Sequence, residues 1–420
     1  MPQKGRCVTK IKTKTFRREI MKGRLRKILA LCLAAVMACA LLAGCGSSSE
    51  SSSGSSSEDS AAAEDKGTII YLSQMTSGAQ YEALVAYGEA LCEYLGYDFT
   101  VVYGDTNNDP AENLNAVANA MTSDVVGIIA CQDGGISNIL EEYPDLYVIG
   151  AFTDMASVYD EDGSSHSAYD NDHFLGTLCD GYADGTNMGI DYAEEVIANG
   201  YTKVATITFP DYAYPQLVAA DEAFREYIAE YNETADEQIE IVGDATILVF
   251  SVLEDSYFLD EDYQDLDAIV AFCSDSFVYS TLKTAQANGT CSADTKLLSS
   301  GWEDDSDYQA DIGETIAFLS GSPVESIGYS IIMLDNAISG LTYSDMPDEP
   351  QRIDSVRQNI RDQEDVELLN ANILGTGNAE DAWISVEEFA QCALSVNSDA
   401  TYEGLLELYY SGALTTEAHR

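Results

Sequence analysis

The sequence is short of positive charge. Its 420 residues hold 20 lysines and arginines against 72 aspartates and glutamates, a formal net charge of −52. Such a surface repels nucleic acid and anionic lipid headgroups, so neither is an expected partner. It also disfavours phosphate and other anionic ligands. A solvated acidic coat that only aids solubility explains most of this charge, but the scarcity of cations still limits any binding site.

The residues of metal and redox sites are also scarce. There are three histidines, no Cys-x-x-Cys pair and no Cys/His spacing typical of a metal site, so we expect neither a metal nor another cofactor. The histidines are His166, His173 and His419. Six cysteines follow Cys45, namely Cys92, Cys131, Cys179, Cys273, Cys291 and Cys392. Two of them end apolar runs, where a free thiol behaves as a small hydrophobe, so we expect mostly free, structural thiols.

Catalytic motifs are missing as well. The chain has no G-x-S-x-G, no phosphate-binding P-loop and no histidine-based catalytic set. His166 lies within a turn-rich segment from Thr153 to Asp172, where we expect a crossover between lobes, and His173 directly follows it, so both could reach a central cleft. In the absence of a catalytic motif, we do not expect an enzyme.

The N-terminus predicts export and anchoring. From Met21 the chain has basic residues followed by an apolar stretch over residues 28–42, a pattern typical of a secretory signal. The stretch ends in Leu42-Ala43-Gly44-Cys45, which resembles a bacterial lipobox. The resemblance implies cleavage before Cys45, a lipid on its thiol, and a protein held on the extracytoplasmic face of the cell membrane. The alternative is an ordinary signal peptide with an incidental cysteine.

This processing would make the protein more acidic. Eleven of the 20 basic residues and one acid, Glu19, lie before Cys45, which leaves nine basic and 71 acidic residues and a net charge near −62. Residues 46–66 are a Ser/Gly/acidic tether of low complexity.

From Gly67 onward, short apolar runs alternate with amphipathic segments. The predicted strands are 68–72, 99–103, 125–130, 146–151, 203–209, 238–243, 268–272 and 296–299. The predicted helices include 81–95, 111–121, 191–199, 216–231 and 278–288. This alternation is typical of βαβ units with parallel sheets, and about 350 ordered residues exceed one comfortable core. We therefore predict an α/β protein with two lobes.

Polar or acidic residues follow three of these strands, at Ser73-Gln74, Ser274-Asp275 and Trp302-Glu303-Asp304. Parallel sheets bind ligands outside the carboxyl ends of their strands, and a helix N-terminus stabilises an acid there. A plain helix cap explains each residue taken alone. The recurrence at the same topological place favours a ligand crevice.

Five ordered segments resemble the type I periplasmic binding proteins, the ribose- and galactose-type solute-binding proteins. They are GYDFTVVYGDTNNDPAENLNAV, DVVGIIACQ, SHSAYDN, AIVAFCSDSFVYSTLKTAQANG and SSGWED, within residues 67–341. The resemblance implies two Rossmann-like lobes, with parallel sheets joined by three hinge crossings, that close on a small solute. We expect an N-terminal lobe of residues 67–170 plus about 316–342, a C-terminal lobe of 171–315 plus about 343–400, and a helical tail over 401–420.

The resemblance also implies a set of ligand-binding residues. They are Asp275, Ser274, Glu303, Trp302, Tyr81, Gln74, Cys131, Phe152, Asp170, Tyr212, Tyr214 and the hinge residue Phe318. Asp275 is the strongest candidate. Tyr81 on its amphipathic helix and Trp302 are also explained as core residues.

Departures from the family pattern limit the classes of solute that would suit the cleft. Relatives that bind sugars often carry Asp-Arg after the fourth strand, where this chain has Ala151-Phe152-Thr153, and an arginine in the helix that here begins YAYPQLVAADEAF. Without arginine forks, an aromatic and acidic cleft favours a neutral solute with a flat apolar face, or a cation. Simple pentoses and anions are less suited to it.

The resemblance implies the binding component of an ABC importer, a monomer that takes a small, neutral, sugar-like solute and delivers it to a permease. A nucleoside or cationic small-molecule binder, or a sensing module for a receptor partner, remain alternatives. No DNA-binding helix-turn-helix precedes Gly67, which excludes a repressor of this fold.

Overall fold

The first sheet is parallel throughout and carries the amino-terminal part of the fold. The structure is a computed structural model that describes residues 66–105, 108–155, 166–179, 186–211, 214–249 and 251–420. The strand order is β12-β5-β4-β3-β1-β2. The bounds are β1 Thr68–Ser73, β2 Asp98–Tyr103, β3 Val125–Ala130, β4 Tyr147–Ala151, β5 Phe174–Leu178 and β12 Gln351–Ile353.

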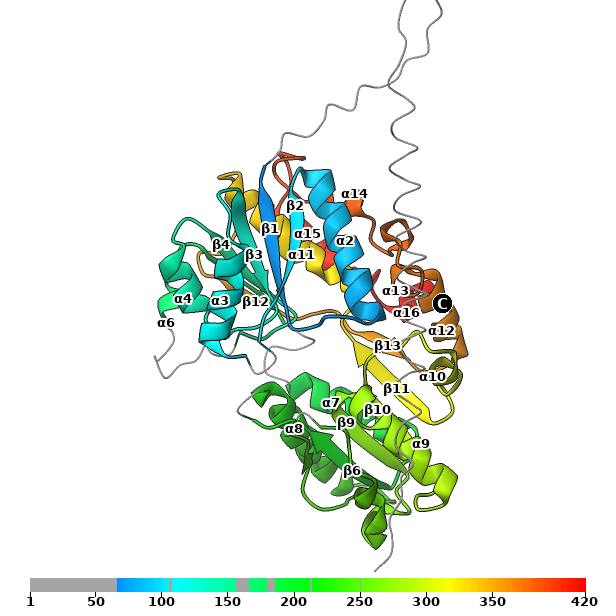
Figure 1. Ribbon diagram of the computed structural model, residues 1–420. Coiled ribbons are helices and arrows are strands. Elements are labelled where there is room, and N and C mark those ends of the chain that lie inside the picture. The colour runs from blue at the N-terminus through cyan, green and yellow to red at the C-terminus, as the bar shows by residue number, and fades with distance from the viewer. Residues whose placement is uncertain (1–65, 106–107, 156–165, 180–185, 212–213, 250) are drawn as a thin grey trace, which may run out of the picture. The chain divides into compact units, whose positions relative to one another are not determined.

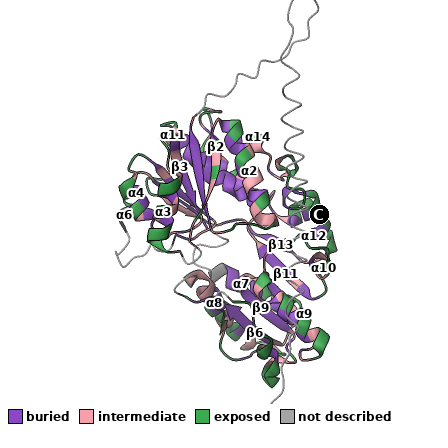
Figure 2. Cartoon of the chain, in the orientation of Figure 1, coloured by how far each residue is buried: buried purple, intermediate pink, exposed green. Residues whose placement is uncertain are grey.

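Helices cover both faces of this sheet (Figure 1). They are α2 Ala79–Leu95, α3 Pro110–Ala120, α4 Ile136–Glu142, α6 His166–Tyr169 and α11 Ile327–Ile338. Along β1, Ile69 and Tyr71 join one hydrophobic cluster, whereas Ile70 and Leu72 join another. All of β1 is buried, as expected for a parallel strand covered on two sides (Figure 2).

The second sheet has the order β13-β11-β10-β9-β6-β7, with β8 also paired to β6. Its strands are β6 Lys203–Thr208, β7 Glu240–Ile241, β8 Thr246–Ile247, β9 Ala268–Ser274, β10 Lys296–Ser300, β11 Ile316–Gly321 and β13 Gln358–Ile360. Only the β11–β13 pair is antiparallel among the pairings of the described residues. The helices around it are α7 Thr186–Ala198, α8 Pro215–Asn232, α9 Tyr279–Asn288 and α10 Ser306–Ala310, with the 3₁₀ turns η1 Asp255–Leu259, η2 Glu261–Tyr263 and η3 Asp275–Phe277. The predicted α/β fold with parallel sheets is confirmed.

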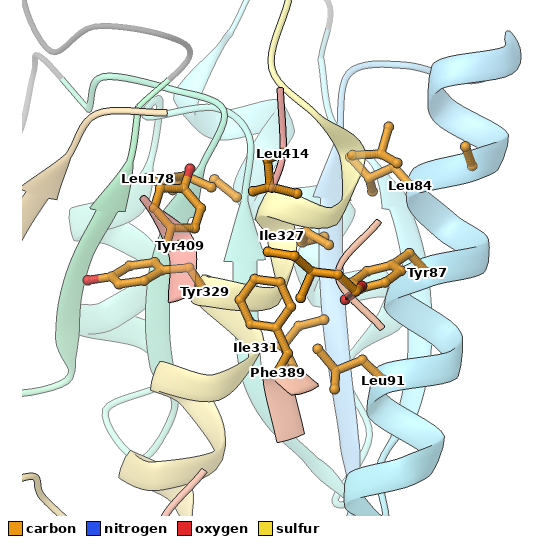
Figure 3. Close-up of a cluster of buried hydrophobic side chains, with 14 of the residues drawn as sticks. Leu84, Tyr87, Leu91, Leu178, Ile327, Tyr329, Ile331, Phe389, Tyr409 and Leu414 are labelled. Carbon is orange, nitrogen blue, oxygen red and sulfur yellow. Dashed lines mark hydrogen bonds between the residues drawn. The ribbon is translucent and has the colours of Figure 1, made fainter. Parts of the chain in front are cut away.

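Residues 363–420 form an additional helical segment, here called the C-terminal module. It contains α12 Gln363–Ala371, α13 Ile373–Thr376, η5 Ala379–Asp381, α14 Val386–Ala390, α15 Tyr402–Tyr409 and α16 Thr416–His419. Figure 3 shows Phe389, Tyr409 and Leu414 of the module packed among side chains of α2 and α11. The Phe389 ring meets Tyr87 edge-on at 6.3 Å. It also lies against Gly328, where a Cβ would come within 2.8 Å of the ring. The module is therefore part of the core that covers the first sheet.

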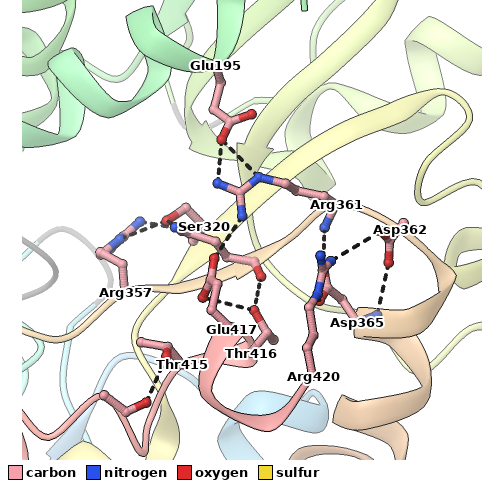
Figure 4. Close-up of polar contacts among 12 residues, drawn as sticks. Glu195, Ser320, Arg357, Arg361, Asp362, Asp365, Thr415, Thr416, Glu417 and Arg420 are labelled. Atoms are coloured by element: carbon pink, nitrogen blue, oxygen red, sulfur yellow. Dashed lines mark hydrogen bonds and ion pairs between the residues drawn. The ribbon is translucent and has the colours of Figure 1, made fainter. Parts of the chain in front are cut away.

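The chain passes between the two sheets after β5, after β11 through the 3₁₀ turn η4 Val324–Ser326, and between β12 and β13. Buried Arg357 ties the last two passages together, because its Nε donates to Ser320 Oγ at 3.0 Å and its Nη2 to the Ser320 carbonyl at 2.8 Å (Figure 4).

The strands differ from the expected lobe boundaries at two places. The boundaries at 170 and about 316 put β5 in the second lobe and β11 in the first, whereas β5 pairs with β4 in the first sheet and β11 with β10 in the second. Much of residues 343–400 packs on α2 instead of the second sheet. Apolar periodicity identifies a strand or helix but not the sheet that it joins. Among the described residues, no helix is both long and apolar enough to cross a membrane.

Candidate functional site

The carboxyl ends of β1, β3 and β4 bring three predicted residues to one edge of the first sheet. The register pairs Leu72 with Ala130 and Ala130 with Gly150, so the residues that follow these strands are neighbours. The backbone N–H of Gln74 donates to Cys131 Sγ at 3.1 Å. Burial raises the pKa of the Cys131 thiol to about 11, so it is a neutral contact group and not a nucleophile.

Phe152, the third of these residues, is half-buried and has φ +60°. A left-handed conformation is uncommon for a side chain of this size, and it marks a constrained turn directly after β4.

At the end of β9, Asp275 is almost fully enclosed, with 1% of its surface exposed. Its carboxylate accepts hydrogen bonds from Tyr308 Oη, from Ser274 Oγ at 3.2 Å and from the Ser276 N–H at 2.8 Å. Gly301 approaches so closely that a Cβ there would lie 2.1 Å from Asp275 Oδ1. The aspartate is therefore built into the tips of β9 and β10 by several contacts.

Burial raises the pKa of Asp275 to about 6. The hydrogen bonds from Tyr308, Ser274 and Ser276 act in the opposite direction, and the charge of Glu303 adds to the increase. The carboxyl group therefore titrates close to neutral pH, where an exposed aspartate is fully ionised.

The segment after β10 contains Trp302 and Glu303. Trp302 is 4% exposed and belongs to the large core cluster, and its indole Nε1 has no hydrogen-bond partner among the described residues. Glu303 is exposed, and partial burial together with the charges of Asp304 and Asp305 raises its pKa. The structure thus places the tryptophan in the core and the glutamate at the surface.

An aromatic group at the ends of β6 and β9 includes two residues that the sequence analysis missed. The Phe209 ring lies 5.3 Å from Tyr214 and 5.0 Å from Phe277, the latter edge-on. Phe209 directly follows β6 and Phe277 ends η3, the same position after a strand that drew attention to Asp275. The rule missed both because it selected polar or acidic residues after a strand, and because the predicted strand 203–209 included Phe209, whereas β6 ends at Thr208.

One hydrogen bond joins the two strand-end groups. Tyr214 Oη, beside the second sheet, donates to Gln74 Oε1, at the end of β1, over 3.4 Å. The structure therefore brings together Gln74, Cys131 and Tyr214 directly. It holds Ser274 and Asp275 at the corresponding end of the second sheet.

Other predicted residues lie elsewhere. Tyr81 Oη shares a 2.8 Å hydrogen bond with Tyr103 Oη, at the outer strand of the first sheet, and burial together with this contact raises the pKa of Tyr81 to about 12. Phe318 is 1% exposed and packs edge-on against Tyr192, so it is a core residue and not an accessible contact. Asp170 is exposed after α6. Tyr212 lies outside the described residues, as does the whole signal sequence with Cys45.

Of the histidines whose side chains are described, neither His173 nor His419 forms a site with these residues. His173 stacks on Tyr147 at 4.4 Å, next to the amino ends of β4 and β5, which is the opposite edge of the sheet. His419 stacks on Trp383 at 4.2 Å. The side chain of His166 is outside the described part of the chain.

Two surface hollows lie away from the strand ends. One of about 460 Å³ is bounded by α15 and Asp345, and one of about 280 Å³ lies near the end of α11 and Tyr147. None of the predicted ligand-binding residues lines either hollow. The candidate site therefore depends on topology and on the Tyr214–Gln74 contact, and not on an enclosed cavity.

Comparison with solved structures identifies the fold. A glucose-galactose binding protein from Geobacillus stearothermophilus matches with a TM-score of 0.52 and 16% identity over 71% of this chain and 98% of that one. A periplasmic ribose ABC transporter protein from Conexibacter woesei gives 0.52 and 15% over 74% and 97%. An ABC transporter solute-binding protein from Agrobacterium vitis, bound to α-D-tagatopyranose, gives 0.54 and 15% over 71% and 96%.

No protein-family model and no curated protein matches the sequence. The structural matches show that the chain has the fold of the type I periplasmic binding proteins, as the sequence motifs predicted.

Proposed function

We propose that the protein is a lipid-anchored solute-binding protein of an ABC-type importer, which holds a small neutral, sugar-like solute between the ends of its two sheets. The hydrogen bond from Tyr214 to Gln74 carries this proposal, because it brings the ligand-facing ends of both sheets within reach of one small molecule. Proteins with this fold and sugars or sugar transport in their descriptions support it.

The side chains at these ends suit a polyol. Tyr214 and Phe277 offer aromatic faces for the apolar side of a sugar ring, and Gln74 and Ser274 offer an amide and a hydroxyl. Glu303 adds a carboxylate that accepts hydrogen bonds from hydroxyl groups. None of the residues proposed for the site is a lysine or arginine, so an anionic ligand would remain without a counter-charge.

A cationic solute or a nucleoside is the second candidate. Partial burial and, after it, the carboxylates of Asp304 and Asp305 raise the pKa of Glu303, and a cation bound there would relieve the repulsion among these carboxylates. The aromatic group around Phe209 would accept a nucleobase as readily as a sugar face.

The anchor and the partner are proposed on the sequence. A lipid on Cys45 and the tether of residues 46–66 would keep the protein beside a membrane permease. A sensing module that delivers the solute to a receptor would have the same sequence features. Co-purification of membrane partners with the anchored protein would show whether the partner is a permease or a receptor.

The test is a thermal-shift screen of neutral sugars, nucleosides, amino acids and polyamines, followed by calorimetry on the compounds that raise the melting temperature. We expect a neutral sugar to bind. Asp275 is enclosed, so it acts by positioning Ser274 and, through Tyr308, the segment after β10. Asp275→Ala should therefore weaken that binding at least tenfold, about 1.4 kcal/mol, whereas Asp294→Ala, at an exposed position before β10, should not. Binding of an anion alone, or equal affinities in both variants, would contradict the proposal.

A further inference from the structure

The segment after β10, residues 302–310, contacts the candidate site through Tyr308. Residues 302–310 carry Glu303, whose carboxylate is exposed, and Tyr308, whose hydroxyl holds the buried carboxylate of Asp275. The Tyr308 ring also meets Tyr279 edge-on at 5.2 Å. The position of this segment therefore determines where Asp275 and Glu303 lie.

Gln309 connects this segment to the C-terminal module. Its Nε2 donates to the Glu303 carbonyl at 3.1 Å, which closes the segment on itself. Its Oε1 accepts from Asn370 Nδ2 at 3.0 Å, and its backbone carbonyl accepts from Gln363 Nε2 at 2.9 Å. Gln363 Nε2 also donates to the Ile312 carbonyl at 2.8 Å. Both donors, Gln363 and Asn370, belong to α12.

Helix α12 is itself held firmly. Asp362 caps its first turn by accepting from two backbone N–H groups, at 2.9 and 3.2 Å. Arg420, the last residue, pairs with the fully buried carboxylate of Asp365 at 2.7 Å (Figure 4). On its other side, Val366 and Leu369 are buried in the large core cluster that includes α2. The helix thus provides a fixed surface built on the first lobe.

The C-terminal module contacts both the first lobe and α10. The module meets the first lobe through buried apolar side chains; its contact with α10 adds amides that are exposed or half-exposed, beside Tyr308 and Ile312, which belong to the same buried cluster as Val366 and Leu369. Exposed hydrogen bonds of this type are individually weak because water competes for the same groups, so the amide contacts can separate and re-form.

We propose that α12 is a latch for the ligand site: Gln363 and Asn370 hold Gln309, and Gln309 positions the 302–310 segment and, through Tyr308, Asp275. Gln309 is a positioning residue, since it touches the site segment and not the bound solute. The inference deepens the proposed function, because the positioned segment is part of the site proposed above.

Trp302 provides a readout that needs no solute. It is buried within the segment, and the other tryptophan, Trp383, is removed as a signal by Trp383→Phe. In that background, Gln309→Ala in the full-length protein should at least double the acrylamide quenching constant of Trp302 and shift its emission to the red. Gln309→Glu keeps the acceptor for Asn370 but replaces the donor to the Glu303 carbonyl, so it should produce the same change. Asn370→Ala should produce a smaller one.

Gln391→Ala, at an exposed glutamine of the same module, is the matched control. In the reciprocal background Trp302→Phe, quenching of Trp383 should not respond to Gln309→Ala, which distinguishes a local release of the segment from general loosening. Unchanged Trp302 quenching in both folded Gln309 variants, or equal responses of the two tryptophans, would overturn the latch.

A second arm measures binding of D-galactose by calorimetry. The latch predicts a three- to thirtyfold loss of affinity in Gln309→Ala and none in Gln391→Ala. If the parent protein fails to bind any sugar, the proposed function fails while the quenching arm still decides the latch. If D-galactose binds equally to both variants, the latch has no role in the site and is overturned.

Discussion

At the scale of single residues, the carboxylate of Asp275 is both buried and held by several hydrogen bonds. It is enclosed at the tip of β9, and its oxygens already accept from Tyr308, Ser274 and the Ser276 N–H. A group held by this many donors has a fixed orientation, which is what a binding site requires. Burying the ionised Asp275 carboxylate costs free energy, because the charge is transferred from water into the protein.

That cost makes stability depend on pH at this residue. Burial raises the folded-state pKa of Asp275 to about 6 from its ordinary value near 3.8, so the folded protein binds this proton more tightly than the unfolded chain does. The resulting contribution to stability is complete below about pH 3.8 and is lost as the pH rises through 6. It amounts to roughly 2–3 kcal/mol.

Asp275→Asn should remove this dependence while still accepting a hydrogen bond from Tyr308. Measured by guanidinium unfolding, the variant should gain on the order of 2 kcal/mol relative to the parent between pH 4 and pH 7. Asp294→Asn, at an exposed site, should follow the parent throughout. A stability difference that stays constant over this range would show that Asp275 does not titrate as proposed.

Individual site residues could be predicted only in part. The rule that ligands bind beyond the carboxyl ends of parallel strands correctly placed Gln74 and Ser274 at those ends, because it depends on topology alone, and the family resemblance added Cys131. It could not tell that the Phe318 ring points into the core, since the direction of a side chain depends on register and packing. It also could not show that Tyr81 would pair with Tyr103, a residue 22 positions away.

At the scale of elements, the strands were predictable and their partners were not. The apolar run 268–272 became β9, and the helix expected over 278–288 begins one residue later, at Tyr279. The segment from 342 to 400 was harder, because its helices are short and are held by distant contacts. For example, Tyr87 Oη donates to the Ile384 carbonyl at 2.8 Å across almost 300 residues.

The packing of the segment between α15 and α16 against the first lobe can be tested through Leu414. This side chain is fully buried among α2 and α11 side chains (Figure 3). Leu414→Ala should lower the free energy of unfolding by about 2–5 kcal/mol, because it removes buried methyl groups and leaves a cavity. Val396→Ala, at a valine that is 42% exposed, should change it by less than about 0.5 kcal/mol. A loss below about 1 kcal/mol for Leu414→Ala would mean that the tail is only loosely held.

At the scale of the whole molecule, the entry point of the tether is opposite to the candidate site. Lys66 immediately precedes the amino end of β1, whereas the site residues follow the carboxyl ends of the strands. Lys66 Nζ pairs with the fully buried Asp335 at 2.7 Å and lies 5.1 Å from the centre of the Tyr97 ring. Ser395 of the C-terminal module donates to the same carboxylate at 2.6 Å. If the protein is anchored as proposed, a tether that joins the fold at Lys66 would leave the proposed site edge free for solute and permease.

The proposed lipid anchor can be tested at Cys45. Replacing Cys45 by Ser removes the only thiol in the predicted lipobox, so no lipid can be attached there and the protein should leave the membrane fraction. Radioactive fatty acid should label the parent and a Cys392→Ser control, whose cysteine lies in the C-terminal module, but not the Cys45→Ser variant.

The lipid that the lipobox resemblance implies on Cys45 is a diacylglycerol, and two acyl chains hold a protein to a bilayer far more tightly than one acyl chain does. The strongly acidic protein gains no attraction from anionic headgroups. Membrane retention should therefore depend on the lipid alone and persist in high salt. If Cys45→Ser still incorporates fatty acid, or if salt releases the parent protein, the lipobox interpretation is wrong and the tether has another attachment.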